Sequence, residues 1–198
     1  MAGETREQII KATERLIKLK GLARVTTKEI ARATNLSEGA LYRHFDRKED
    51  VFFALLSTHL PPFLETFKTY VAGEGSVSKN FVAIVQACIN YYESLIPLGA
   101  AFFSDAELLA QFRTIVQQHG GGPLRIHDLV AAYIEEEQQI GRISKQVPAL
   151  NIAIQLLGPC FQFVFFRQCL GESPWGKTNE QFAEEQVQAL LSGHRPSE

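Results

Sequence analysis

Apolar positions recur along this chain at intervals of three and four residues, the period of an α-helix that buries one face. Ile9, Leu16 and Ile17 mark such a face in the first segment, which ends near Lys20 and Gly21. The sequence has no alternating runs joined by Asn-Gly or Asp-Gly, the pattern typical of a β-hairpin. These patterns predict an all-α protein of about nine helices.

Several helix starts carry Ser, Thr or Asp followed three positions later by Glu or Gln, which is the capping-box pattern. This pattern occurs at 5–8, 26–29 and 46–49. Asn35 tolerates the left-handed conformation of a tight helix exit, and Ser37 is expected to cap the short helix that follows. Four successive helix starts are therefore expected within the first fifty residues.

Beyond these starts, helices are expected over six segments separated by linkers rich in Gly, Pro or Ser. Pro61 and Pro62 lie inside the first of these segments. Because proline removes a backbone donor and clashes with the preceding turn, the sequence predicts a kink or break near residues 59–60. The expected segments are 46–71, 78–96, 104–118, 122–139, 148–170 and 178–191.

Two short helices, expected over 28–34 and 38–44, are joined by a turn of about three residues, which gives them helix-turn-helix proportions. Leu41 and Phe45 lie four residues apart and can share one small core, which leaves the opposite face exposed. Gly39 on that face costs roughly 1 kcal/mol relative to Ala. We interpret Gly39 as clearance that lets the first turn approach bases in the major groove.

The stretch TTKEIARATNLSEGALYRHFDRKEDV resembles the head of the TetR family of one-component transcriptional regulators. The resemblance covers about the first fifty-five residues. Thr34, Asn35 and Leu36 stand where the family usually has Ala, Gly and Val, a difference that conserves turn geometry and packing. The matching residues are Ile10, Leu16, Gly21, Thr27, Ile30, Ala31, Ser37, Gly39, Leu41, Tyr42, His44, Phe45, Lys48 and Glu49.

The resemblance implies a three-helix DNA-binding head over residues 1–47 and a helical body for effector binding and dimerisation over residues 48–198. It implies contacts to the DNA backbone and to bases, with Glu38 able to accept from a cytosine amine and Arg43 able to donate to guanine or phosphate. The structural alternatives are that Tyr42 only covers the core, that Glu38 only stabilises the helix dipole, and that Lys48 is solvated. The expected DNA-binding residues are Thr26, Thr27, Lys28, Ser37, Glu38, Gly39, Ala40, Tyr42, Arg43, His44 and Lys48.

Charge is distributed unevenly along the chain. Residues 1–60 carry eleven Lys and Arg against eight Asp and Glu, a net charge of +3, and the remaining residues carry nine against fourteen, a net charge of −5. A basic head on an acidic body suits contact with a polyanion, although a solvated basic helix gives the same excess. Because one small head supplies few contacts, we expect a homodimer on double-stranded DNA with a palindromic operator.

The segment 147–171 has Arg167 as its one charged residue and is long enough to span a bilayer. Polar residues spread along it, and no basic cluster or aromatic belt flanks it, so a buried helix and no membrane contact are expected. The resemblance implies that the last two helices form a four-helix dimer seam. The expected dimer residues are Leu156, Phe163, Phe166, Phe182, Gln186, Val187 and Leu190.

The other body helices are rich in aromatic and aliphatic residues at helical spacing. A plain Phe-rich core accounts for most of them, but a cavity lined in this way would accept a bulky hydrophobic small molecule. The resemblance implies that such an effector releases the DNA. The expected pocket residues are Phe81, Val85, Cys88, Tyr91, Tyr92, Phe102, Phe103, Phe112, Ile126, Val130, Tyr133 and Phe161.

The sequence shows no recognisable set of catalytic residues, phosphate-binding glycine loop or metal-ligand pair, so no enzyme and no cofactor are expected. Cys88, Cys160 and Cys169 lack metal-ligand spacing and are interpreted as reduced, buried thiols of a cytoplasmic protein. The prediction is a cytoplasmic repressor that binds DNA as a dimer. The alternative is a helical regulator or carrier module without a small-molecule effector, acting through a protein partner.

Overall fold

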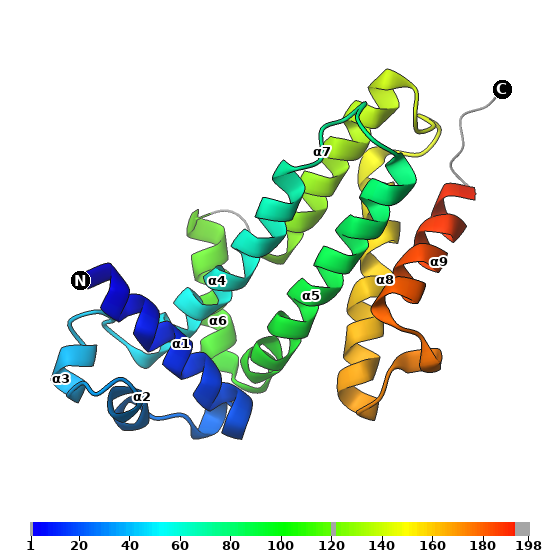
Figure 1. Ribbon diagram of the computed structural model, residues 1–198. Helices are drawn as coiled ribbons and strands as arrows, with labels where there is room; N and C mark the ends of the chain where they lie inside the picture. The colour runs from blue at the N-terminus through cyan, green and yellow to red at the C-terminus, as the bar shows by residue number, and fades with distance from the viewer. Residues whose placement is uncertain (1, 120–121, 193–198) are drawn as a thin grey trace. The chain divides into compact units, whose positions relative to one another are not determined.

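The computed structural model describes residues 2–119 and 122–192. All regular structure in these residues is helical, in nine α-helices and three short 3-10 turns, which confirms the all-α prediction (Figure 1). The chain divides into two compact units: unit 1 is Met1–Pro61 with Ser94–His119, and unit 2 is Pro62–Glu93 with Gly120–Glu198. Unit 1 therefore contains more of the chain than the three-helix head expected from the sequence.

Unit 1 has a hydrophobic core of its own beneath the helices of the head. Ile9, Ile30 and Val51 are fully buried in it, and Leu98 and Leu108 join it from later in the chain. Such burial stabilises short helices that would be marginal alone. Its helices are α1 (Ala2–Lys20), a 3-10 turn (Leu22–Arg24), α2 (Thr27–Ala33), α3 (Glu38–Leu41), the first part of α4 (Lys48–Lys68), the end of α5 (Val77–Ser104) and α6 (Ala106–His119).

Two of the expected helix starts in the head are confirmed by their hydrogen bonds. The Thr26 hydroxyl accepts from the Glu29 N–H at 3.3 Å while the Glu29 carboxylate accepts from the Thr26 N–H at 3.0 Å, a complete capping box. The Ser37 hydroxyl accepts from the Ala40 N–H at 3.1 Å and begins α3. Asn35 has a φ of 55°, as expected for the left-handed exit from α2.

The other two starts were placed wrongly. Helix α1 begins at Ala2, so Thr5 lies within the helix and does not cap it. Helix α4 begins at Lys48, and the carboxylate that closes its start is Asp50, which accepts from the Arg47 N–H at 2.9 Å. The predicted pairing of Asp46 with Glu49 has the right spacing but is one residue out of register.

The prolines in the long helices do not interrupt them as the sequence predicted. One helix, α4, spans Pro61 and Pro62, so a break at 59–60 is absent, while a kink there stays a prediction. Likewise α5 continues through Pro97 to Ser104, where a linker had been expected. A proline removes one donor from the helix, and the hydrogen bonds on either side persist when packing favours them. Burial of Leu98 in the core of unit 1 provides such packing in α5.

Unit 2 is built around α8, which packs between α7 and α9 (Figure 1). Leu156, Cys160, Phe163 and Val164 form its fully buried face. The rings of Phe163 on α8 and Phe182 on α9 are stacked with their centroids 4.1 Å apart, and this contact packs α8 against α9. The bounds in this unit are α7 (Arg125–Ile140), α8 (Ala149–Leu170) and α9 (Asn179–Ser192), with 3-10 turns at Gly122–Leu124 and Pro174–Gly176.

Two helices have the length and composition of membrane spans. They are Val77–Ala100, with a mean hydropathy of 1.3, and Ala149–Leu170, with a mean hydropathy of 1.6. The core helix of a soluble protein has the same properties, so the similarity is weak evidence for a membrane. Phe81 and Ile84 on the first helix and Leu156 on the second are fully buried within the protein, and 39% of each span is buried.

Candidate nucleic-acid interface

Helix α3 and the turns on either side of it present an exposed surface above the core of unit 1. Leu41 and Phe45 are buried under this surface, and the guanidinium of Arg6 from α1 lies 4.7 Å from the centre of the Phe45 ring. The expected helix ends at Leu41, and the residues up to His44 form turns. The buried pair thus orients the opposite side chains outward, as the four-residue spacing indicated.

Gly39 lies in the middle of the exposed surface. A Cβ at this position would meet no atom within 4 Å, and the backbone is not left-handed there. Neither internal packing nor backbone conformation therefore requires glycine at position 39. Glycine at position 39 costs roughly 1 kcal/mol in a helix and leaves this part of the exposed surface without a side chain.

Cations on this surface fall into two groups. The exposed Lys28 and Arg43 have no ion pair within the described residues, so both are available to phosphate or base edges. Lys48 is half-buried, donates to the Val25 carbonyl at 3.4 Å and lies 5.5 Å from the centre of the Phe52 ring. Lys48 therefore has a structural role in the free protein, which differs from the solvated helix start that the sequence offered as the alternative.

The carboxylates at the two helix starts differ in how they are held. Lys20 pairs with Glu29, and this pair, together with the hydrogen bonds from Thr26, lowers the pKa of the Glu29 carboxyl to about 2. Glu38 instead accepts one hydrogen bond, at 2.9 Å, from the Thr27 hydroxyl across the turn. The Glu29 carboxylate is thus bound by Lys20 and Thr26 of the head, whereas Glu38 is exposed next to Gly39.

The remaining predicted DNA-binding residues lie on the same part of unit 1. Tyr42 is 46% exposed, which leaves its hydroxyl accessible, and His44 is half-buried. Thr26 and Ser37 are exposed, but their hydroxyls already accept the capping hydrogen bonds of α2 and α3. Ala40 is half-buried. All the predicted DNA-binding residues therefore lie between Thr26 and Lys48 in unit 1.

The residues predicted to line an effector pocket are divided between the units. Phe103 and Phe112 belong to unit 1, and the side chain of Phe102 lies outside the described residues. Tyr92 packs edge-on against Phe161 with ring centroids 5.4 Å apart, and Tyr133 packs against Phe81 at 6.3 Å. The pocket residues that lie in unit 2 are Phe81, Val85, Cys88, Tyr91, Tyr92, Ile126, Val130, Tyr133 and Phe161.

Polar groups among these aromatic residues are held in the neutral state. Burial raises the pKa of Tyr91 to about 12, with a further contribution from Cys88. Burial and the contact with Cys160 raise the pKa of the Cys88 thiol well above its usual range. The two thiols are buried and free as expected, but Cys169 is exposed, which corrects the prediction for that residue. An uncharged, apolar environment of this kind suits a hydrophobic ligand.

The predicted dimer residues are used within the chain. Leu156, Phe163 and Val187 are fully buried, and Phe182 and Leu190 are less than one-tenth exposed. Phe166 and Gln186 are half-buried, and the Gln186 amide donates to the Gln155 carbonyl at 3.0 Å. These side chains are therefore engaged in the packing of unit 2, and another face of α8 is exposed.

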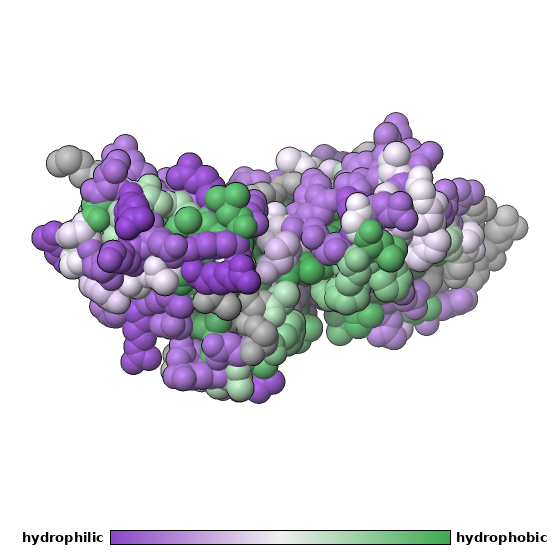
Figure 2. Space-filling view, turned by 90° about the horizontal axis from the view of Figure 1, so that it is seen from below, coloured by the Kyte–Doolittle hydropathy of each residue, from purple (hydrophilic) through white to green (hydrophobic). Residues whose placement is uncertain are grey.

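That other face of α8 was missed by the sequence argument. Leu150, Ile154, Phe161 and Phe165 are between 43% and 50% exposed and recur at intervals that place them on one side of the helix. Gly158 lies among them, and a Cβ there would meet no atom within 4 Å. Figure 2 shows that hydrophobic residues also reach the surface in patches on the face that it draws. The signal in the sequence is that α8 is apolar on nearly all sides.

A polar network in unit 2 was also missed. The Tyr133 hydroxyl donates to the buried Glu137 carboxylate at 2.7 Å and accepts from the Asn80 amide at 2.9 Å. Arg142 lies 3.3 Å from Glu137 and donates to the Gly75 carbonyl at 2.8 Å. These bonds connect the turn after α7 to the turn before α5 and give the buried Glu137 a structural role.

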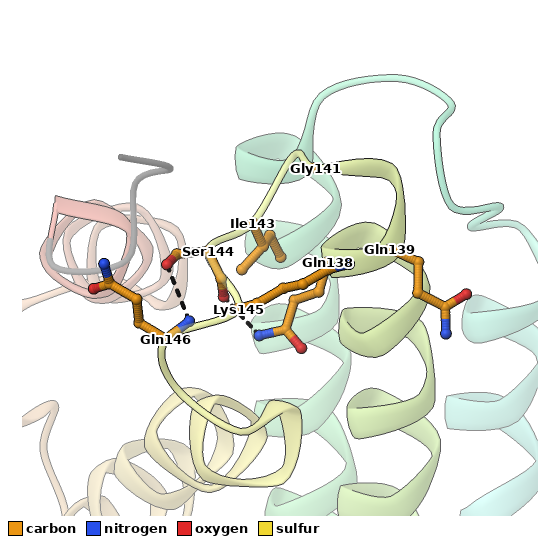
Figure 3. A pocket seen from close by; sticks show the side chains of 7 residues that line it. All are labelled: Gln138, Gln139, Gly141, Ile143, Ser144, Lys145 and Gln146. Atoms are coloured by element: carbon orange, nitrogen blue, oxygen red, sulfur yellow. Dashed lines mark hydrogen bonds between the residues drawn. The ribbon is translucent and has the colours of Figure 1, made fainter. Parts of the chain in front are cut away.

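A hollow of about 490 Å³ lies at the turn between α7 and α8 (Figure 3). The Gln138 amide in it donates to the Ser144 and Val147 carbonyls at 2.7 and 2.8 Å, and the Ser144 hydroxyl accepts from the Gln146 N–H. These polar groups are satisfied within the turn, and none of the predicted effector residues line the hollow. In the described residues no three His, Cys, Asp or Glu side chains group as metal ligands.

Comparison with known proteins connects the head to one family. The model of bacterial regulatory proteins, tetR family, matches residues 9–55. Over 57 residues the chain is 44% identical to the HTH-type transcriptional regulator TtgR of Pseudomonas putida, covering 29% of this chain and 27% of TtgR. The match thus spans about a quarter of the length of this curated relative.

The agreement in fold extends much further than the agreement in sequence. A TetR-family transcriptional regulator from Mesorhizobium loti superimposes with a TM-score of 0.79 over 98% of each chain at 20% identity. The regulator FadR from Bacillus subtilis, solved in complex with stearoyl-CoA, has a TM-score of 0.72 over 94% of this chain and 98% of its own, at 16% identity. Residues 9–55 thus match the tetR family of bacterial regulatory proteins, and the chain as a whole shares the fold of these solved structures.

Proposed function

We propose that this protein is a DNA-binding transcriptional repressor, in which residues 1–47 bind DNA and residues 48–198 form the body. It binds a palindromic operator as a dimer in the cytoplasm and performs no catalysis. The observation that carries the proposal is Gly39, an exposed glycine at which a Cβ would meet no atom within 4 Å. The exposed Lys28 and Arg43, which have no ion pair among the described residues, supply positive charge.

The reasoning from Gly39 is steric. A recognition helix reads base edges only when its first turn enters the major groove, where every added side-chain atom increases the distance to the bases. Glycine at the second position of α3 minimises this distance, and Ala40 beside it adds one methyl group. Exposed cations on either side can then contact phosphates and set the register of the helix on the duplex.

Dimerisation is supported by the exposed face of α8. Four large apolar side chains at regular spacing, with Gly158 among them, form a stripe that water solvates poorly. A second copy of α8 can cover this stripe, and glycine at its centre permits close approach of the two helices. We therefore assign the dimer seam to the stripe of Leu150, Ile154, Phe161 and Phe165.

Effector binding is supported by the aromatic residues of unit 2 and by one buried polar atom. Among the described residues no hydrogen-bond partner is found for the buried Nδ1 atom of His127 on α7. A ligand that is largely apolar and carries one polar group would suit such surroundings. We propose a hydrophobic small molecule of this kind as the signal that releases DNA, in line with the stearoyl-CoA bound by the FadR relative.

Selection of bound sequences from random DNA, followed by titration of the selected site, tests the proposal. The wild-type protein is expected to select a palindrome, and its affinity is expected to fall steeply with salt because phosphates contribute contacts. Gly39→Leu is expected to weaken binding by roughly 10- to 100-fold, the equivalent of one lost base contact or more. Its melting temperature should stay at or above the wild-type value.

A control variant separates the steric role of position 39 from a general effect on the surface. Gly99→Leu introduces the same side chain at another helix glycine with open space, on α5 and outside residues 1–47. The affinity for the selected operator should then stay at the wild-type value. Selection of no sequence by the wild-type protein, or equal DNA affinity of wild type and Gly39→Leu, would contradict the proposal.

A further inference from the structure

Glu38 is an acidic side chain on a surface that is proposed to meet a polyanion. In the described residues no Lys or Arg pairs with it, and its one hydrogen bond is the 2.9 Å contact from the Thr27 hydroxyl. Glu29, in the first turn of α2, is by contrast neutralised by Lys20 and used in the capping box. Glu38 therefore keeps lone pairs available on the exposed side of α3.

The chemistry of a carboxylate restricts what Glu38 can contact on DNA. An ionised carboxylate accepts hydrogen bonds and donates none, so the phosphates, which are anionic acceptors, repel it. In the major groove the hydrogen-bond donors are the amino groups of cytosine N4 and adenine N6. Glu38 on this surface is hence unfavourable for binding in general and favourable opposite an amino-bearing base.

The neighbouring atoms on the two bases decide between them. Adenine presents the acceptor N7 next to its amino group, which repels the second oxygen of a carboxylate. Cytosine presents a C–H group beside N4 and has no such acceptor of its own at that edge. A carboxylate consequently accepts from cytosine with less repulsion than from adenine.

We propose that Glu38 selects cytosine at one position of each half-site and that Thr27 is its positioning residue. This inference rests on the proposed function, and names the base that the DNA-binding surface reads at that position. The Thr27 hydroxyl has a single hydrogen, which it donates to Glu38 Oε2. While it does so, it cannot donate to a phosphate, so its contribution is to base choice and not to general affinity.

The experiment measures base preference and not affinity alone. Operator selection and competition binding with all four bases at each half-site position are carried out on the full-length wild type, Glu38→Gln, Glu38→Ala, Thr27→Val and Thr27→Ser. The wild type is expected to prefer cytosine at one position by at least about fivefold. Glu38→Ala should abolish that preference, and Glu38→Gln should transfer it to adenine, which presents both a donor and an acceptor to an amide.

The two threonine variants test the positioning role. Thr27→Val keeps the shape of the side chain and removes the hydroxyl, so the preference for cytosine should fall several-fold while binding to other positions is unchanged. Thr27→Ser keeps the hydroxyl and should keep the preference. The thermal unfolding of each variant shows that the head remains folded.

Failure of this inference is distinguishable from failure of the proposed function. If the wild type selects a palindrome but no cytosine preference depends on Glu38, or if Glu38→Ala changes affinity equally for all four bases, the inference is overturned while DNA binding stands. Equal preferences in Thr27→Val and Thr27→Ser overturn the role of Thr27. Selection of no DNA sequence by the wild type overturns the proposed function itself.

Discussion

Two parts of this molecule, residues 26–48 of unit 1 and α8 of unit 2, expose side chains that their own folding does not require. Residues 26–48 expose the charged side chains of Lys28, Glu38 and Arg43 around a glycine. Helix α8 exposes a stripe of aliphatic and aromatic side chains around another glycine. Polar groups at fixed positions can form hydrogen bonds with base edges. An apolar stripe is instead suited to burial against another apolar surface.

The same two parts differ in what determines their structure. Helices α2 and α3 are short, and hydrogen bonds from Thr26, Glu29 and Ser37 within four residues define their starts. Helix α8 begins after Pro148 without a side-chain cap, and its position depends on burial against α7 and α9. Sequence similarity follows the same division, since it is found over residues 9–55, whereas the agreement of the whole chain is one of fold.

The largest expected effect is on the stability of α8. Leu156→Ala removes a fully buried side chain from unit 2 and is expected to lower the free energy of unfolding by about 2–5 kcal/mol. Leu170→Ala makes the same substitution on the same helix at a position that is 63% exposed. It should change the free energy of unfolding by less than about 0.5 kcal/mol. Urea unfolding followed by the fluorescence of Trp175 measures both, and equal effects would show that α8 is not held by burial.

A smaller effect is expected on association. Ile154→Glu places a charge in the exposed stripe of α8 and should dissociate the dimer at micromolar concentration, since an unpaired charge in an apolar interface is strongly unfavourable. Ile140→Glu is the matched control, because Ile140 is similarly exposed, at 55%, on α7. Sedimentation velocity measures the outcome. If Ile140→Glu dissociates the dimer and Ile154→Glu does not, the assignment of the dimer seam to α8 is wrong.

The smallest effect concerns the capping carboxylate of the head. The pKa of Glu29 is lowered from its ordinary value of 4.5 to about 2, so its stabilising contribution is present above pH 4.5 and is lost as the pH falls toward 2. The melting temperature of Glu29→Gln should therefore be below that of the wild type at pH 7 and approach it near pH 2. Lys20→Gln, which removes the partner, should behave in the same way. A difference in melting temperature between Glu29→Gln and the wild type that does not change with pH would exclude ionisation of Glu29 as its cause.

Prediction from the sequence was most successful where local hydrogen bonds decide the structure. The capping box at Thr26, the cap at Ser37 and the left-handed Asn35 were all expected and are all present. At the start of α4 the same pattern was read one residue out of register, because Asp46–Glu49 and Arg47–Asp50 offer similar spacings. A local pattern determines that a helix begins, while competition between neighbouring candidates determines where.

Prediction failed where distant parts of the chain decide the outcome. The continuation of α5 through Pro97 depends on the burial of Leu98 against residues of α1 and α4, which no local pattern contains. The side chains of α8 read as apolar on nearly all sides, so periodicity did not distinguish the buried Leu156 and Phe163 from the exposed Ile154 and Phe165. That distinction determines which residues are available to a second copy of the chain.

The sequence alone determined the all-helical fold class, the helix-turn-helix with its caps, and the side chains on its exposed face. These features depend on helical periodicity and on hydrogen bonds between residues three or four apart, which are encoded within short segments. Only the tertiary structure decided that Thr27 holds Glu38 across the turn and which face of α8 remains open. Both depend on contacts between segments, whose free energies arise only once the helices have packed.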